Sequence, residues 1–285
     1  MEKSQCDSVA KSRLQPRYCI YIGSLLLSPL LLICLLFLWS GGLFKHATAR
    51  PISFPFPSCH KIWAHQGYAK TGGANSLRGV REAFRRGAKG VEIDIIFDSN
   101  LGDFVVSHHS PYVLFDKKPL MLRTVLSEFQ GRGLFWLDAK NLGKLAPSTA
   151  YGATKLLSDM LKMYRLADRS FVESSNPLYL SWLASRDIYT SLAVHLDERK
   201  YGKLAYLLNV AAMKLAYVYV GSGAVSMGHS RYTPTTAAAF EGAPVLLSTV
   251  NDPEALQRLS TDTNVKVLLS DDDHYYIDAC ALAEG

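Results

Sequence analysis

Two acidic residues inside an apolar stretch are the first candidates for chemistry in this sequence of 285 residues. Glu92 and Asp94 lie two positions apart in Val-Glu-Ile-Asp-Ile, and because strand side chains alternate, both point to the same face. Two buried carboxylates repel each other and are costly to desolvate unless a cation lies between them. Asp138, in Phe-Trp-Leu-Asp-Ala-Lys, offers a third carboxylate. Oxygen ligands of this kind favour Mg²⁺, Ca²⁺ or Mn²⁺ over zinc, so we expect a site for one divalent cation.

Two histidines end other apolar runs. His65 follows Ile-Trp-Ala, and His108 follows Phe-Val-Val-Ser. Imidazole titrates near neutrality, so one histidine could take a proton from an attacking oxygen while the other protonates a leaving alkoxide. Lys140 shares a face with Asp138, and its ammonium could bind a phosphate oxygen. Together with the cation, these groups indicate cleavage of a phosphodiester.

Each of these residues also has a structural interpretation. A histidine after a strand is often only a hydrogen-bonded residue, and Glu92 and Asp94 could form a buried ion-pair network with Lys140. His195 and His229 occupy similar positions, and we leave both outside the predicted site. The occurrence of all the candidates at the ends of apolar runs favours the catalytic interpretation.

These residues must be positioned by apolar strands that alternate with amphipathic helices. This alternation predicts a parallel sheet covered by helices, and eight strand-helix units predict a TIM-type (β/α)8 barrel, with a doubly wound sheet as the alternative. In such a barrel the active site lies at the carboxyl ends of the strands. We expect strands at 61–67, 90–97, 133–141, 170–175, 189–196, 217–227, 244–251 and 265–271, an additional extended run at 103–109, and helices at 76–88, 122–129, 148–164, 178–185, 198–215, 235–240, 253–259 and 275–283.

The first fifty residues predict a membrane anchor. No Lys, Arg, Asp or Glu occurs from residue 18 to 44, and a run of about 20 apolar residues suffices to cross a bilayer. We therefore expect a cytoplasmic tail at 1–17, a single transmembrane helix at 18–44, a Pro-rich spacer at 45–59 and the barrel at 60–285. The positive-inside bias places the barrel in the periplasm or another extracytoplasmic space; the charges concerned are Lys3, Lys11, Arg13 and Arg17 before the helix, against Lys45 and Arg50 after it. A cleaved signal peptide ending near Ala47-Thr48-Ala49 is the alternative.

Net charge and cysteine content bear on nucleic-acid binding and on disulfide formation. The formal net charge of +6 is dispersed, without the basic runs expected of a nucleic-acid-binding protein. Of the five cysteines, only Cys59 and Cys280 fall in the expected barrel, where they form a disulfide or remain free thiols.

The candidate residues, in their order along the chain, resemble the pattern of the glycerophosphodiester phosphodiesterases over residues 60 to 285. The resemblance implies a TIM barrel, a cation on Glu92, Asp94 and Asp138, the acid-base pair His65 and His108, and substrates in which a phosphodiester links glycerol to an alcohol. The stretches that carry it are His65-Gln66-Gly67, Ala74-Asn75-Ser76, Gly90-Val91-Glu92-Ile93-Asp94, Val105-Val106-Ser107-His108-His109, Asp138-Ala139-Lys140, Ser174-Ser175-Asn176-Pro177, residues 247–252 and residues 268–272.

Three positions depart from that family's pattern. Gln66 replaces an arginine, Ala74 replaces a glutamate, and His109 stands in place of an aspartate. With the arginine absent, we expect Lys140, Asn75 and Gln66 to contact the substrate. The Asp138-x-Lys140 spacing is similar to that of sphingomyelinase D-like phospholipases, so a lysophospholipid or another lipid-derived diester is an alternative substrate. A non-catalytic barrel that binds a phosphorylated ligand is the alternative from another functional class.

Overall fold

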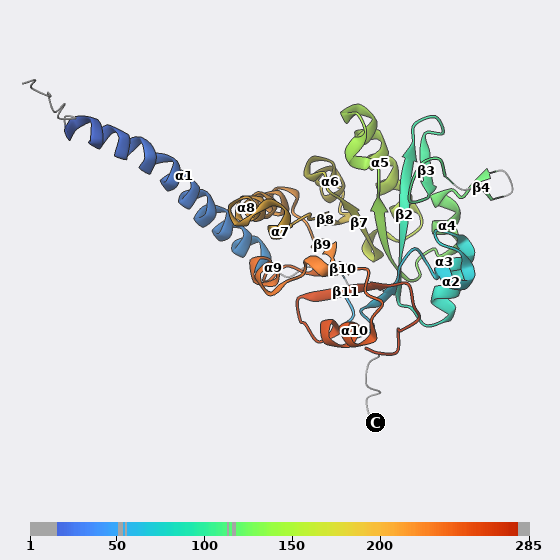
Figure 1. Ribbon diagram of the computed structural model, residues 1–285. Helices are drawn as coiled ribbons and strands as arrows, with labels where there is room; N and C mark the ends of the chain where they lie inside the picture. The colour runs from blue at the N-terminus through green and yellow to red at the C-terminus, as the bar shows by residue number, and fades with distance from the viewer. Residues whose placement is uncertain (1–15, 51–53, 55, 113, 116–117, 279–285) are drawn as a thin grey trace, which may run out of the picture.

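The computed structural model describes residues 16–50, 54, 56–112, 114–115 and 118–278, and its central feature is a closed barrel of eight parallel strands (Figure 1). Every neighbouring pair is parallel, and β1 pairs with both β2 and β11, which closes the ring. The barrel prediction is confirmed, and an open doubly wound sheet is excluded. The strands are β1 (Ile62–Ala64), β2 (Gly90–Asp98), β6 (Leu134–Ala139), β7 (Ser170–Ser174), β8 (Tyr189–Ala193), β9 (Ala224–Gly228), β10 (Val245–Ser248) and β11 (Val265–Ser270).

A hairpin extends one barrel strand beyond the ring. β3 (Asp103–Val106) pairs antiparallel with the last residues of β2, with Val106 opposite Ile95. The pairing returns the chain from the end of β2 to the level of Asp94 in its middle, where Ser107 N donates to Asp94 O at 2.9 Å. A short pair, β4 (Leu114–Phe115) and β5 (Lys118–Pro119), follows.

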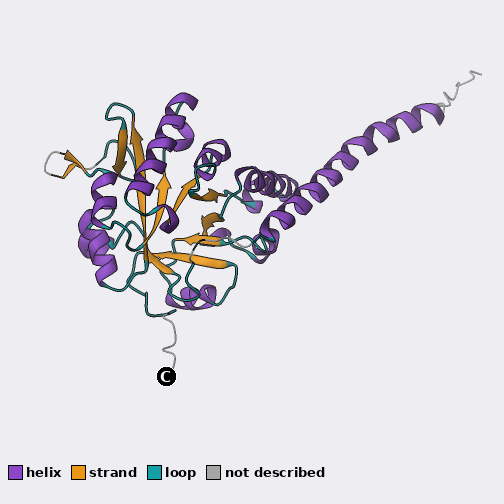
Figure 2. Ribbon diagram, turned by 180° about the vertical axis from the view of Figure 1, so that it is seen from behind, coloured by secondary structure: helices purple, strands orange, loops and turns teal. Residues whose placement is uncertain are grey.

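Helices cover the outside of the barrel (Figure 2). Several begin at side-chain caps that the sequence supplies: Ser76 accepts from Gly79 N, Asn176 from Tyr179 N and Asp252 from Ala255 N. Such caps satisfy backbone donors that the first helical turn leaves free. The described helices around the barrel are α2 (Ala69–Gly72), α3 (Leu77–Arg85), α4 (Leu122–Glu128), α5 (Pro147–Met163), α6 (Pro177–Ala184), α7 (Glu198–Tyr201), α8 (Lys203–Val220), α9 (Pro234–Ala239) and α10 (Pro253–Ser260).

Three predicted boundaries differ from the structure. The strand expected at 217–227 begins only at Ala224, because Tyr217 to Val220 complete the last turn of α8, which Gly221 ends in a left-handed conformation. The run Tyr-Val-Tyr-Val has a high strand propensity, but its packing within a long helix overrides that propensity. Gly202 separates α7 from α8 within the single helix expected at 198–215. Residues 275–278 form a turn, and the rest of the helix expected at 275–283 lies outside the described residues.

A long helix precedes the barrel. α1 (Pro16–Thr48) projects away from the domain, and only its carboxyl-terminal part packs on it (Figure 1). Ser40 and Phe44 are 1% and 3% exposed, and Phe44 contacts the rings of Tyr217 and Phe240. Ser40 and Phe44 thus pack on the barrel domain, although the sequence predicts that both belong to the transmembrane helix.

The amino-terminal end of the barrel is filled by aromatic residues. The Phe54 ring lies 4.0 Å from that of Phe171, and both belong to the same buried cluster as Trp63 and Trp136. Phe54 thus closes the end of the barrel opposite the expected active site, so part of the predicted spacer belongs to the core.

The two ends of the barrel sequence are joined. His60 N donates to Asp278 O at 2.9 Å, and the Lys61 ammonium donates to the carbonyl of Ser260. Cys59 is disulfide-bonded. Cys280, the partner suggested by the sequence, lies outside the described residues.

Candidate active site

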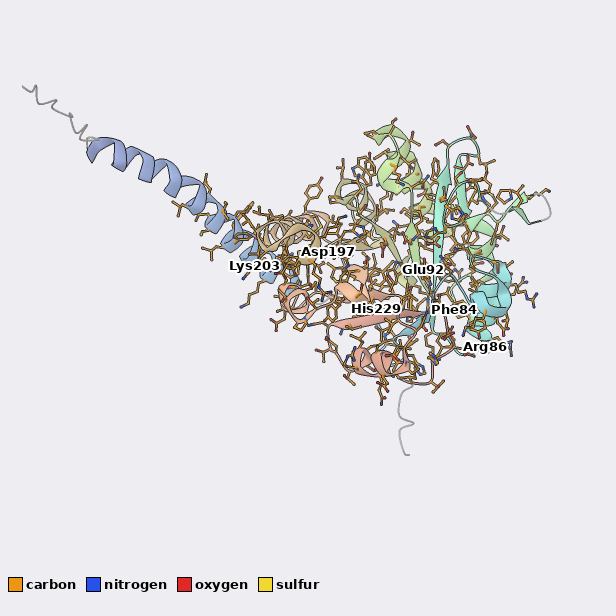
Figure 3. The ribbon with its side chains drawn as sticks, viewed as in Figure 1. Phe84, Arg86, Glu92, Asp197, Lys203 and His229 are labelled. Carbon is orange, nitrogen blue, oxygen red and sulfur yellow. The ribbon has the colours of Figure 1, made fainter. Side chains whose placement is uncertain are left out.

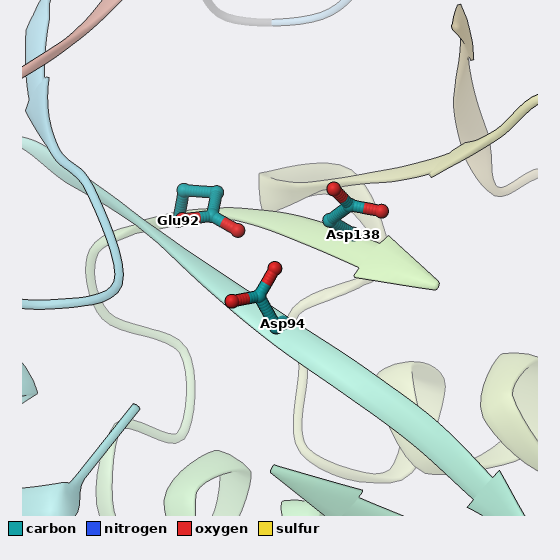
Figure 4. Close-up of side chains that lie close together, drawn as sticks. All are labelled: Glu92, Asp94 and Asp138. Carbon is teal, nitrogen blue, oxygen red and sulfur yellow. The ribbon is translucent and has the colours of Figure 1, made fainter. Parts of the chain in front are cut away.

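Three carboxylates converge at the carboxyl end of two adjacent strands (Figure 4). Glu92 and Asp94 come from β2 and Asp138 from β6, and Asp94 stands opposite Asp138 in the strand register. Ligand atoms of the three lie within 4.8 Å of one another. Glu92 and Asp94 are 2% and 0% exposed. The predicted carboxylate cluster is therefore present, and its geometry fits one divalent cation.

The electrostatics of the cluster also fit a cation. Burial raises the pKa of Glu92 well above its usual value, and the charges of Asp94 and Asp138 raise it further. Burial likewise raises the pKa of Asp138, against the opposing effect of Lys140. Carboxylates whose ionised form is destabilised in this way are stabilised when a metal ion neutralises their charge.

Lys140 lies between two of these carboxylates. Its Nζ is 2.8 Å from Asp94 Oδ1 and also contacts Asp138 Oδ2. Burial opposes the charge of Lys140, but the two carboxylates outweigh it and raise the lysine pKa. The ammonium therefore stays charged at neutral pH, next to the cluster, as binding to a phosphate oxygen would require.

His65 follows β1 and is oriented by a neighbouring strand end. Its Nδ1 lies 2.7 Å from Asp271 Oδ1, and its Nε2 lies 3.8 Å from Glu92 Oε2. Asp271 in turn accepts a bond from Asn251 Nδ2 at 2.7 Å. Burial disfavours the charge on Asp271, but the bonds from His65 and Asn251 outweigh burial and lower its pKa. An ionised Asp271 therefore fixes the imidazole and leaves Nε2 facing the carboxylate cluster.

The turn after β1 supports the same carboxylates. Gln66 N donates to Glu92 Oε2 at 2.8 Å, and Gln66 Nε2 and Asn75 Nδ2 donate to Asp94 Oδ2 at 2.6 and 2.7 Å. Gly67 adopts φ +70°, and a Cβ on it would lie 2.9 Å from the carbonyl carbon of Gly79. Gln66 and Asn75, which we expect to contact substrate, both bind Asp94 in this structure.

His108 lies just beyond β3 and is exposed. Ser107, the residue before it, donates its backbone N–H to the carbonyl of Asp94 at 2.9 Å, so His108 follows directly beside the carboxylate cluster. His109 Nδ1 is 3.4 Å from His108 Nδ1. The antiparallel hairpin thus brings the second predicted histidine to the rim of the same site.

Two residues that we had not selected also belong to the site. Asp271 ends the apolar run Leu-Leu-Ser-Asp, which is the same pattern that identifies Glu92, Asp94 and Asp138. Glu173 stands opposite Asp138 in the register of β7 and β6. Burial and the charge of Asp138 raise the pKa of Glu173 to about 8. The apolar run Phe-Val-Glu-Ser could have identified it.

The site opens into a groove formed by three adjoining cavities. The first, of about 450 Å³, is lined by Asp138, Lys140, Glu173 and His195, among others. A second, of about 330 Å³, shares His195 with the first. A third, of about 700 Å³, shares Asp197 and Arg231 with the second and reaches Lys203 at the start of α8. In Figure 3, Glu92 lies inside the barrel, whereas Asp197 and Lys203 lie toward α8. His195, which lies outside the predicted site, thus lines both the first and the second cavity. His229 follows β9 and lies outside the carboxylate cluster.

Comparison with solved structures defines the class of fold. The structure is similar to that of a glycerophosphodiester phosphodiesterase from Parabacteroides distasonis, with a TM-score of 0.56 and 20% identity, over 74% of this chain and 92% of that chain. It matches a glycerophosphodiester phosphodiesterase from Thermotoga maritima with a TM-score of 0.56 and 16% identity, over 76% and 96%. An Oleispira antarctica phosphodiesterase, solved with its product sn-glycerol-3-phosphate, matches with a TM-score of 0.58 and 16% identity, over 76% and 94%.

The protein therefore has the fold of the glycerophosphodiester phosphodiesterases, and the resemblance inferred from the sequence is confirmed at the level of fold. The sequence itself matches no family model and no curated protein.

Proposed function

We propose that this protein is a metal-dependent phosphoric diester hydrolase that cleaves glycerophosphodiesters or related lipid-derived diesters. The observation that carries the proposal is the convergence of three carboxylates, Lys140 and two histidines at the carboxyl ends of the barrel strands. A structural ion-pair network would need one cation for each buried carboxylate. Among the described residues, Lys140 is the one lysine or arginine that pairs with the cluster, through Asp94 and Asp138, while Glu92 lies 3.8 Å from the His65 ring. One lysine for three carboxylates leaves an excess of negative charge that a divalent ion would neutralise.

Each residue has a role in the proposed reaction. Glu92, Asp94 and Asp138 would hold one divalent cation, Mg²⁺ or Ca²⁺ with Mn²⁺ as a further candidate, which stabilises negative charge on the phosphate oxygens when it is bound. His65 and His108 transfer protons to and from the attacking and leaving oxygens. Lys140 neutralises a phosphate oxygen, while Gln66 and Asn75 orient Asp94.

The first test is turnover of glycerophosphodiesters by the full chain, purified in detergent, with Mg²⁺, Ca²⁺ or EDTA. We expect cation-dependent hydrolysis, and a fall of about 10²-fold or more in kcat for His65→Ala, because general acid-base catalysis contributes about 10² to 10⁴. His229→Ala is the matched control, since this histidine also follows a barrel strand but lies outside the carboxylate cluster. Folded protein without turnover with any cation, on any diester of the panel, would contradict the proposal.

A second candidate is a sphingomyelinase D-like or lysophospholipase D activity. Gln66 favours it, because this residue replaces a bidentate phosphate donor and its side chain is engaged with Asp94. Lysophospholipids in the same panel distinguish the two activities. Phosphorus NMR at early times tests the chemistry of attack, since a cyclic phosphate appears only if a substrate hydroxyl attacks.

We also propose that α1 anchors the barrel to a membrane, with residues 1–17 in the cytoplasm and the catalytic domain outside it. The helix has 33 residues and is therefore about 50 Å long, more than the roughly 30 Å of a bilayer core. Because Ser40 and Phe44 are packed against the domain, we place the end of the span before Ser40. Alkaline carbonate extraction of membranes tests the anchor: release of the full chain would contradict it.

A further inference from the structure

Exposed apolar side chains gather on two helices. Of the fourteen large hydrophobic residues that are exposed among the described residues, eight lie on α1 and α8. On α8 they include Leu204, 60% exposed, and Tyr219, 62% exposed. Large exposed apolar surfaces mark contacts with other proteins or with lipid. The full set of eight is Leu31, Leu32, Leu35, Leu38, Trp39, Leu204, Leu207 and Tyr219.

The two helices form one surface because they pack against each other. The ring of Phe44 on α1 lies 5.1 Å from that of Tyr217 on α8, and the Lys214 ammonium lies 5.3 Å from the Phe44 ring. One turn earlier in α1, Ser40 is 1% exposed. The apolar side chains of α8 therefore continue those of α1.

The outer face of α8 differs from that of an ordinary barrel helix. Tyr206, Val210 and Tyr217 are buried on its inner face. Leu204, Leu208, Ala212, Leu215 and Tyr219, spaced at helical intervals, form the outer face, where Leu208 and Leu215 are half-buried and the other three exposed. α5, of similar length, instead presents Lys155 and Asp159 to solvent. α8 thus lacks the polar outer face that a helix in water requires.

The charged side chains of the two helices themselves have one sign, although Asp197 and Glu198 lie just before α8. Neither α1 nor α8 contains an aspartate or glutamate. Lys45 and Arg50 lie at the end of α1, and Lys203 begins α8. An apolar face bordered by basic residues is typical of helices that lie in the interface of an anionic bilayer.

We propose that the outer face of α8 lies in the lipid headgroup region of the membrane that α1 enters, so that the barrel rests on the bilayer. This inference depends on the anchoring role of α1 and not on catalysis. It also bears on the substrate. Lys203, the first residue of α8, lines the cavity farthest from the carboxylate cluster, so this part of the groove would lie near the lipid headgroups.

The test measures the depth of nitroxide labels in the full chain, reconstituted in bilayers of phosphatidylcholine and phosphatidylglycerol. Single cysteines replace Leu204, Ala212 or Tyr219 in a chain that carries Cys6→Ser, Cys19→Ser and Cys34→Ser. We expect high accessibility to oxygen and low accessibility to a water-soluble nickel reagent, at a depth of about 5–10 Å.

Leu101→Cys and Tyr276→Cys are the controls, because these side chains are 51% and 72% exposed and lie outside the two helices. Their labels should be as accessible to nickel as those of a soluble protein. Equal access to nickel at α8 and at the controls would overturn the proposal. Low access to oxygen and nickel alike at α8 would also overturn it, because that result indicates burial against a second copy of the chain.

Discussion

At the scale of single residues, hydrogen bonds and ion pairs fix the position of each charged side chain in the site. Asp94, fully buried, receives bonds from Gln66 and Asn75 and an ion pair from Lys140. His65 is fixed by Asp271, so the imidazole cannot rotate away from Glu92 without losing a charge-assisted bond. These contacts preorganise the carboxylates and the histidine before substrate binds.

We expect Asp271→Asn to lower kcat by about 10²-fold with little change in KM, because an amide cannot hold the His65 ring with the same charge and tautomer. The pH profile of kcat should shift as well, and a purely structural role would leave that profile unchanged. Asp273→Asn is the matched control, since Asp273 pairs with Arg86 at the surface. Equal kcat values for the two variants would show that Asp271 does not position His65.

The buried carboxyls also predict how stability depends on pH. The pKa values of Glu92, Asp138 and Glu173 are raised in the folded chain, that of Glu173 to about 8. The folded state therefore binds more protons than the unfolded state above about pH 4.5, and stability should fall as pH rises toward 8 when EDTA removes divalent ions. Mg²⁺ or Ca²⁺ should reverse this trend, because only the ionised carboxylates bind the cation. Thermal unfolding from pH 5 to 8 measures both effects, and a trend that is the same with EDTA and with either cation would contradict the metal site.

At the scale of elements, strand pairing sets the spacing of the candidate catalytic groups. Asp94, Asp138 and Glu173 stand side by side because β2, β6 and β7 are in parallel register. β3 returns His108 to the same end by pairing antiparallel with β2. The turn between β1 and α2 then packs closely against α3, through Gly67 and Gly79.

The close packing of this turn allows us to predict how a single added methyl group at Gly67 changes stability. Gly67→Ala adds a Cβ 2.9 Å from the backbone of Gly79 at φ +70°, so we expect a loss of about 3 kcal/mol in the free energy of unfolding, together with loss of activity. Gly87→Ala is the control, because Gly87 also has a positive φ but no atom within 4 Å of its Cβ position, and should cost about 1 kcal/mol. Chemical denaturation measures the two values. Equal losses would show that backbone conformation alone, and not close packing, requires glycine at position 67.

At the scale of the whole molecule, the barrel is closed by contacts between its first and last segments. Residues 60 and 61 bond to residues 260 to 278, and the neighbouring Cys59 is disulfide-bonded. Phe54 closes the amino-terminal end of the barrel, and α1 packs along α8. Phe54 and residues 59–61, which lie between α1 and β1, are thus part of the folded domain.

We expect Cys59→Ser to lower the free energy of unfolding by about 2–4 kcal/mol, because the disulfide restricts the unfolded chain. Cys34→Ser, at an exposed free thiol, should change it by less than about 0.5 kcal/mol. Denaturation of the full chain in detergent compares the two variants. A Cys59→Ser chain as stable as the control would show that the disulfide adds nothing to the closure of the barrel.

The barrel fold and part of the candidate site could be predicted from the sequence alone. The alternation of apolar strands with amphipathic helices is a local property, so it predicted the barrel and most of its elements. Polar residues that end apolar runs predicted the carboxylate cluster and His65, because strands of a parallel barrel all present their carboxyl ends to one face.

Only the tertiary structure decided the remaining features. Gln66 and Asn75 bind Asp94, Asp271 orients His65, and Tyr217 to Val220 are helical although their types favour a strand. The burial of Phe44 and Phe54 on the barrel was equally hidden in the sequence. Each of these features depends on partners that are distant along the chain or on packing, and such contacts form only when the barrel closes.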